Sequence, residues 1–261
     1  WIENVENITL LIKKLIAEGY KSFRLSSNLF PLYDCAQDLL INNALIKSKL
    51  QSLGQLVKSS NIRLTTHPDQ FCVISSNTES IIDKSVKMLA HHTWVFDNMG
   101  LEESNYYAIN IHGGTKDKLS TLISSIKKLP SNISKRLTLE NDERCYSTYD
   151  LYKVFEETGV PVVFDSHHYK FNTGGLAEEK AFDLAKSTWG NIRPLTHLSN
   201  TEPSLANEKA FNKLRQHSQY VHYIPDYQLQ DNNNDLIDID FEFKMKNLAI
   251  EKAIKDFKIK K

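Results

Sequence analysis

The chain has 261 residues, of which 41% are hydrophobic and 25% charged, so it can bury the core of one α/β-barrel-sized domain. Its 32 Lys and Arg balance 32 Asp and Glu, which excludes a general positive field that would recruit nucleic acid. Its three Cys, at 35, 72 and 145, lack metal-ligand spacing, and no signal peptide or membrane-spanning run is present. These features predict an intracellular protein, cytoplasmic, nucleoid-bound or nuclear, without membrane association.

Short β-branched or aromatic runs alternate along the chain with longer segments of helical period. Amphipathic helices are expected at Glu6–Glu18, Ile81–Asn98 and Thr148–Thr158. The candidate strands are Ser22–Leu25, Ile62–Thr66, Tyr107–Ile111, Leu137–Leu139, Val162–Phe164, Ile192–Thr196 and Ile237–Phe241. This alternation predicts parallel βα units and a single TIM-type (β/α) barrel domain over residues 1–261.

The count of strands is one short of an eight-stranded barrel. The chain opens directly on a helix, so its first strand is expected to be missing. That strand either lies upstream of Trp1, which we favour, or is replaced by an extra strand at Tyr220–Ile224. The polar run at 231–235 (DNNND) is interpreted as a loop.

Six of the candidate strands lead directly into an imidazole or a carboxylate. These side chains are His67, His112, Glu140, Asp165 with His168, His197 and Glu242. In a parallel barrel the carboxyl ends of the strands converge on one face. Clustered carboxylates repel one another unless a cation lies among them, and imidazole with carboxylate suits Zn, Mn or Fe. The pattern predicts more than one bound divalent ion.

Each of these residues has an ordinary structural explanation when taken alone, such as a hydrogen-bonded His or an Asp that caps a turn. Their repetition in register favours the metal site. His91 and His92 lie in mid-helix, away from any strand end, and are expected to be packing or surface residues. His167 is expected to lie behind the ligands or face outward, and His222 stays unassigned.

Seven sequence blocks resemble those of the ultraviolet damage endonuclease (UvdE) family. They are FRLSSNLFPL (23–32), THPDQF (66–71), NIHGGTKDK (110–118), LENDERCYSTYDLYKV (139–154), VPVVFDSHHYKFN (160–172), THLSN (196–200) and FEFKMKN (241–247). The resemblance implies a TIM barrel with a multinuclear metal site, related to apurinic endonucleases of the endonuclease IV type and more remotely to xylose isomerase-like barrels. It also implies an enzyme that nicks DNA immediately 5′ to a photoproduct, usually with Mn.

The family pattern implies roles for particular residues. His67, His112 and Glu140 would hold one ion, and Glu140 would bridge to a second. Asp165, His197 and Glu242 would hold that second ion, while His168 and His217 would help to hold a third. Two or three ions are expected, with Mn preferred and Zn or Mg as alternatives.

A second implied role concerns recognition of the lesion. Gln70 and Phe71 match the Gln and aromatic residue with which the family probes distorted base pairs. An aromatic face can stack on a base and an amide can bond to its edge. Lys116, Lys170 and Lys244 follow strand ends and are candidate phosphate contacts, although each taken singly is better explained as a solvated rim residue.

Three departures from the family pattern bear on this expectation. Two residues before His197, the family carries a Lys that becomes carboxylated, whereas this chain has Leu195. Cys35 stands where a His is expected, and a thiolate would change the metal preference. The family's first strand also brings a Tyr and an Asn to the DNA, and nothing in this chain corresponds. The number and identity of the metals are therefore left open.

Three functions remain open. The first is a metal-dependent DNA repair endonuclease that hydrolyses the phosphodiester immediately 5′ to ultraviolet photoproducts in duplex DNA, with Glu140 as the candidate proton acceptor. The second is an apurinic endonuclease or a xylose isomerase-like sugar-converting barrel. The third is a catalytically inactive DNA-binding remnant. The expected partner is damaged double-stranded DNA, with no obligate protein partner and a monomeric chain.

Overall fold

A computed structural model describes residues 1–229 and 236–259, so the run interpreted as a loop at 231–235 lies outside the described residues. Within these residues, seven strands form one sheet in chain order. They are β1 (Ser22–Leu25), β2 (Arg63–Thr66), β3 (Ile109–His112), β4 (Leu137–Glu140), β5 (Val162–Asp165), β6 (Leu195–Leu198) and β7 (Asp238–Phe241). All seven candidate strands are confirmed, β1 with its predicted bounds and the other six with shifted bounds, and so is the α/β fold class of the TIM type.

Helices occupy the stretches between the strands, as predicted, and the chain opens on α1. The α-helices are α1 (Ile2–Ala17), α2 (Gln37–Ile41), α3 (Ala44–Ser59), α4 (Glu79–Asn98), α5 (Leu119–Lys128), α6 (Ser131–Ser134), α7 (Thr148–Thr158), α8 (Ser166–Tyr169), α9 (Glu178–Ser187), α10 (Phe211–Leu214), α11 (Asp226–Leu229) and α12 (Asn247–Phe257). Three 3₁₀ turns are η1 (Tyr33–Cys35), η2 (Asn105–Tyr107) and η3 (Pro203–Leu205). The run at 220–224 forms no strand, which removes the alternative of an extra strand there.

The chain divides into two compact units. The first comprises Trp1–Ile111 and Ser125–Thr138, and the second comprises His112–Ser124 and Leu139–Lys261. The expectation of a single domain stays a prediction. Among the helices described in either unit, none is long and apolar enough to cross a membrane.

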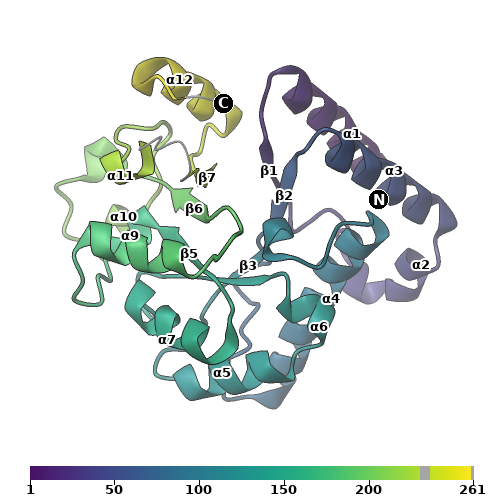
Figure 1. Ribbon diagram of the computed structural model, residues 1–261, viewed down its shortest axis with the longest axis horizontal. Coiled ribbons are helices and arrows are strands. Elements are labelled where there is room, and N and C mark those ends of the chain that lie inside the picture. The colour runs from purple at the N-terminus through teal and green to yellow at the C-terminus, as the bar shows by residue number, and fades with distance from the viewer. Residues whose placement is uncertain (230–235, 260–261) are drawn as a thin grey trace. The chain divides into compact units, whose positions relative to one another are not determined.

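In the first unit, β1 and β2 pair in parallel from Ser22 with Arg63 to Leu25 with Thr66. Helices α1 and α3 lie side by side near these strands (Figure 1). A Cβ added to Gly54 in α3 would lie 1.7 Å from the carbonyl oxygen of Met99. The chain can pass this closely only because position 54 is glycine.

His91 and His92 of α4 are packing residues of the first unit, since both side chains are buried. The ring of His91 stacks on Tyr33 with 3.5 Å between ring centroids. Burial lowers the pKa of His91 to about 4. Burial, with smaller contributions from His91 and His67, lowers the pKa of His92 to about 3. Both imidazoles are therefore neutral at physiological pH.

In the second unit, α7 and α9 pack against β5, and α12 lies at the C-terminal end of the chain (Figure 1). A capping box begins α7: the Ser147 side chain accepts the backbone N–H of Asp150, whose side chain accepts the N–H of Ser147. Gly159 ends the helix with φ 74°, a left-handed conformation that favours glycine. These local signals explain why the predicted bounds of this helix are met.

Candidate metal centre

The carboxyl ends of the strands in the second unit carry the polar side chains that the sequence predicts there. Glu140 and Asp165 are the last residues of β4 and β5, and Glu242 follows β7 directly. The parallel register sets Asp165 opposite His197 of β6. Because neighbouring parallel strands end at the same edge of a sheet, these side chains meet in one cluster.

Glu140 lies at the middle of this cluster, between two imidazoles. Its Oε1 is 3.2 Å from His168 Nδ1, and its Oε2 is 3.1 Å from His197 Nδ1. His197 Nδ1 is also 3.3 Å from Glu242 Oε1. Metal–ligand bonds of about 2.1 Å set at right angles place adjacent ligand atoms about 3 Å apart. The three separations therefore match those of neighbouring ligands around an ion.

Ligand atoms of the second unit form two sets in which all atoms lie within 4.8 Å of one another. The first set is Glu140, Asp165 and His168, and the second is Asp165, His197 and Glu242. Asp165 belongs to both sets. Imidazole and carboxylate are suitable donors for Zn, Mn or Fe.

The two carboxylate oxygens of Asp165 show whether a cation fits this site, because they differ in their hydrogen bonds. Its Oδ1 accepts the backbone N–H groups of His167 and His168, both at 2.7 Å. Its Oδ2 is buried and has no hydrogen-bond partner among the described residues. His168 Nδ1 lies 3.9 Å from this oxygen, beyond hydrogen-bond distance. A buried carboxylate oxygen without a hydrogen bond carries a large desolvation cost, which a bound cation would offset. The donor set thus fits divalent metal.

The electrostatics of the cluster favour an ionised Glu140 beside a protonated or metal-bound His168. Burial by itself raises the pKa of Glu140, but His197, His112 and a hydrogen bond from His168 hold that pKa well below its usual value. Burial works against protonation of His168, but Asp165 and Glu140 raise its pKa well above its usual value. The carboxylates therefore attract positive charge into this buried site.

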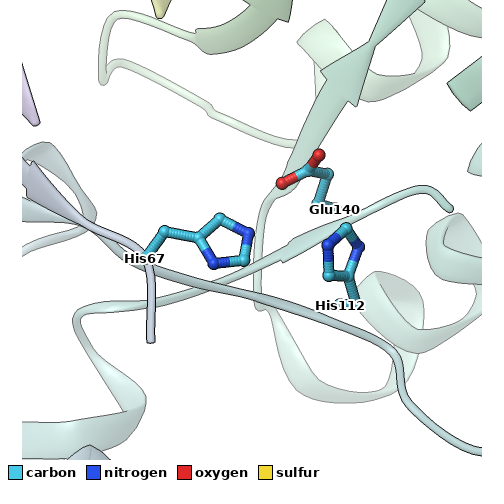
Figure 2. Close-up of side chains that lie close together, drawn as sticks. All are labelled: His67, His112 and Glu140. Atoms are coloured by element: carbon cyan, nitrogen blue, oxygen red, sulfur yellow. The ribbon is translucent and has the colours of Figure 1, made fainter. Parts of the chain in front are cut away.

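His112 lies at the end of β3 and adjoins the cluster, with its ring centroid 5.4 Å from that of His168. Figure 2 shows the side chains of His112 and Glu140 at the ends of their strands. A Cβ on the next residue, Gly113, would lie 2.3 Å from the Tyr146 ring. The Tyr146 hydroxyl in turn accepts the N–H of Lys118 at 3.0 Å and donates to the carbonyl of Thr115. The loop after β3 is fixed by this tyrosine.

His217 reaches the edge of the cluster from a segment that follows β6. Its Nδ1 is 3.9 Å from Glu242 Oε2, and its backbone pairs with Thr201 in an isolated antiparallel bridge. His167 does not face outward: it is fully buried, its ring contacts His217 at 5.6 Å, and burial lowers its pKa to about 4. His167 therefore lies against the cluster.

Sequence reasoning missed three charged neighbours of the cluster. Asp240 Oδ2 is 3.7 Å from His197 Nε2, and Glu143 Oε2 is 3.7 Å from His168 Nε2. Arg215 forms an ion pair with Glu143 at 2.5 Å. Asp240 could have been found from its place two residues before Glu242, since alternate strand residues share a face. No pattern in the sequence points to Glu143 or Arg215.

The first unit holds the other predicted site residues. His67 follows β2, with its Nδ1 2.8 Å from the carbonyl oxygen of Pro68, and is drawn in Figure 2. Gln70 is exposed, and the Phe71 side chain is 72% exposed. The Phe71 N–H is accepted by Asp69 Oδ1 at 3.1 Å, which fixes the turn that presents the ring. Cys35 is exposed in η1.

The remaining predicted positions lie in the second unit. Lys116, Lys170 and Lys244 are exposed, and Lys170 Nζ lies 5.7 Å from the centroid of the Tyr223 ring. Leu195, where the family carries a lysine, is a buried residue of β6 and 1% exposed. An aliphatic side chain has no donor atom, so this position cannot supply the ligand that a carboxylated lysine would supply.

These features define an α/β protein of the TIM type with a candidate centre for divalent metal at its strand ends. The chain belongs to the UvdE family, because the family's model, described as UV-endonuclease UvdE, matches residues 2–261. The resemblance seen in the sequence is thereby confirmed.

Relatives within this family are named as endonucleases, which are enzymes. A UV DNA damage endonuclease of Nostoc sp. is 38% identical over 78% of this chain, and the match spans 63% of that protein. One from Bacillus cereus (strain G9842) is 30% identical over 97% of this chain and 80% of that protein. The crystal structure of SacUVDE has a TM-score of 0.82 at 30% identity, covering 97% of this chain and 85% of that one.

The fold extends beyond the family. A D-tagatose 3-epimerase-like protein has a TM-score of 0.59 at 12% identity, covering 91% of this chain and 97% of that one. At this identity the likeness concerns the fold alone.

Proposed function

We propose that this chain is a metal-dependent DNA repair endonuclease that hydrolyses the phosphodiester immediately 5′ to ultraviolet photoproducts in duplex DNA. The observation that carries the proposal is Glu140, buried between His168 and His197 at ligand separations in a member of an endonuclease family. Damaged double-stranded DNA is the proposed partner, and an intracellular compartment is the proposed location.

The proposed ligands in the second unit come from the two sets of ligand atoms described above, together with His112 and His217. The two sets comprise Glu140, Asp165, His168, His197 and Glu242. His67 stays a predicted ligand, as the family resemblance implies. Mn is the preferred metal, with Zn or Mg as alternatives, and two or three ions are proposed. Such ions supply Lewis acidity, which lowers the pKa of a water and offsets the charge of the phosphate. Leu195 has no role in metal binding, because its side chain has no donor atom.

The chain's own residues have three further proposed roles. Glu140 is the proton acceptor, because it is ionised and its two carboxylate oxygens face the imidazoles of His168 and His197. Gln70 and Phe71 probe the damaged base pairs, in keeping with their exposure. Lys116, Lys170 and Lys244 contact backbone phosphates, which would position the DNA without reading its sequence.

A nicking assay on three end-labelled duplexes tests this function. One duplex carries a single cyclobutane dimer, one an abasic site and one no lesion, each with Mn. We expect cleavage of the dimer duplex that EDTA abolishes. Cleavage of the abasic duplex alone would make the protein an apurinic endonuclease, and metal-loaded protein that cleaves none of them would be a binding remnant. Glu156→Gln, at an exposed position of α7, provides a control for Glu140→Gln.

A further inference from the structure

The imidazole rings of His168 and His197 are oriented in the same way: in each ring, both nitrogens lie near a carboxylate. Nδ1 of each imidazole faces Glu140, at 3.2 Å for His168 and 3.1 Å for His197. Nε2 of each lies 3.7 Å from an outer carboxylate, Glu143 in one case and Asp240 in the other. Two imidazoles from different strand ends thus lie between an inner and an outer carboxylate.

A carboxylate beside one ring nitrogen stabilises the proton on that nitrogen and leaves the other nitrogen free to ligate. Histidines that bind metals usually have such a partner, which sets the tautomer and the orientation of the ring. A separation of 3.7 Å is that of an ion pair rather than a hydrogen bond, so the effect here is electrostatic.

We propose that Glu143 and Asp240 are positioning residues of the metal centre, which hold the proton of His168 and His197 on Nε2 so that Nδ1 ligates. The inference rests on the metal centre of the proposed function and assigns the outer carboxylates no contact with substrate. It also names the ligating atom of each imidazole.

Glu143 is held in place from both sides. Its Oε1 forms an ion pair with Arg215, at 2.5 Å. The loop that carries it is fixed by Asp142, whose Oδ1 accepts the N–H of Arg144 at 2.8 Å. Arg144 also lies 4.9 Å from the centroid of the Phe211 ring and donates to Asn212 Oδ1 at 3.1 Å. The loop after β4 is therefore bound to the segment around α10.

Arg215 also connects Glu143 with the segment that carries His217. Two hydrogen bonds join the start of this segment to its end. The Ser218 N–H donates to the carbonyl oxygen of Asn200 at 2.8 Å, and the Thr201 hydroxyl donates to the carbonyl oxygen of Leu214 at 2.7 Å. The Arg215–Glu143 pair therefore joins this closed segment to the loop after β4.

The opposite tautomer makes the inference testable. Glu140 lies 3.2 Å from Nδ1 of His168 and 3.1 Å from Nδ1 of His197, so it could itself accept a proton from either nitrogen. A further contact of His168 favours the same tautomer. His168 Nδ1 lies 3.0 Å from the carbonyl oxygen of Asn141, which could accept a proton from that nitrogen. In that case Nε2 would be the ligating atom and Glu143 would face it directly. The two arrangements differ in which nitrogen carries the proton.

The test is ¹⁵N NMR of the imidazoles in the full chain loaded with Zn, a diamagnetic ion, together with equilibrium binding of Mn. We expect His168 and His197 to carry their proton on Nε2. We expect Glu143→Gln and Asp240→Asn to weaken Mn binding by about 10- to 100-fold and to alter the signal of the facing imidazole. Glu208→Gln and Asp256→Asn replace exposed carboxylates that form ion pairs with lysines, and serve as matched controls.

A proton on Nδ1 of His168 and His197, or Mn affinity unchanged in both variants, would overturn the inference. The tautomer is read in the wild-type chain, so the test does not depend on folding of the variants. Wild-type protein that binds no metal would overturn both this inference and the proposed function. Metal binding that depends on Glu143 and Asp240, in a protein that nicks no DNA, would support the inference and overturn the function.

Discussion

Glu140 and His197 are in direct contact inside the second unit, with 3.1 Å between Oε2 and Nδ1 and each side chain only 1% exposed. A carboxylate and an imidazole at this depth lose most of their hydration, so their arrangement requires a compensating charge. A bound divalent ion would supply that charge in the loaded protein. The pair is therefore the first place to test for a bound metal ion.

Glu140→Gln removes the charge of the residue that both imidazoles face. We expect Mn affinity and the single-turnover nicking rate each to fall by at least about 100-fold, because a neutral amide is a poor ligand and no proton acceptor. Mn titration and rapid-quench nicking measure the two effects. A nicking rate within a few-fold of the Glu156→Gln control would contradict the role of Glu140.

Metal removal should lower the stability of the fold as well as activity. Apo protein leaves Asp165 Oδ2 buried without a hydrogen-bond partner among the described residues, and binding to the native state alone stabilises it. At a free Mn concentration of 100 times Kd, we expect about 2.7 kcal/mol of stabilisation per site. Thermal unfolding with and without EDTA measures this gain. The same gain in Asp165→Asn would show that the metal binds elsewhere.

Gln70→Ala combined with Phe71→Ala should reduce discrimination between damaged and intact duplex while leaving metal content unchanged. Stacking of one base on an aromatic ring contributes about 1–3 kcal/mol, so a roughly 5- to 150-fold loss of preference is expected. Phe71 is 72% exposed, so the fold should tolerate its removal. Leu39→Ala, at a side chain 71% exposed in α2, controls for loss of surface apolar area. Unaltered discrimination would remove the probe role.

Acid stability should depend on His91. Its pKa in the fold is about 4, below the value of 6.5 without the fold, because the ring is buried. The unfolded chain therefore binds more protons between pH 6.5 and about 4, and stability falls as the pH drops through this window.

His91→Phe keeps an aromatic ring against Tyr33 and removes the titrating group. Between pH 7 and pH 4, we expect the free energy of unfolding to fall by up to about 3 kcal/mol less in the variant than in wild type. Urea unfolding at several pH values measures the slope, with His222→Phe at an exposed position as control. Identical slopes for wild type and His91→Phe would contradict the burial argument.

The sequence predicts the elements of this fold well and their ends less well. Ser22–Leu25 and Thr148–Thr158 meet their predicted bounds, because alternation and a capping box are local signals. The strand expected at Ile192–Thr196 is observed at Leu195–Leu198, after Pro194. Proline has no N–H for the ladder, which explains the later start.

Some residues of the candidate site can be predicted from the local sequence, and others depend on contacts between distant parts of the chain. Glu140, Asp165 and Glu242 follow strands directly, so topology alone predicts that they meet. The pairing of Glu143 with Arg215 joins positions that are far apart in the chain, and no periodicity encodes it. The burial of His167 likewise depends on packing against Phe171 and His217.

Anomalous diffraction at the Mn edge, from crystals of the full chain grown with Mn, would locate the ions around Glu140 directly. We expect anomalous peaks at the strand ends of the second unit, within about 2.2 Å of Glu140 and of Nδ1 of His168 or His197. Crystals with bound Mn elsewhere and none at Glu140, Asp165 and Glu242 would contradict this expectation.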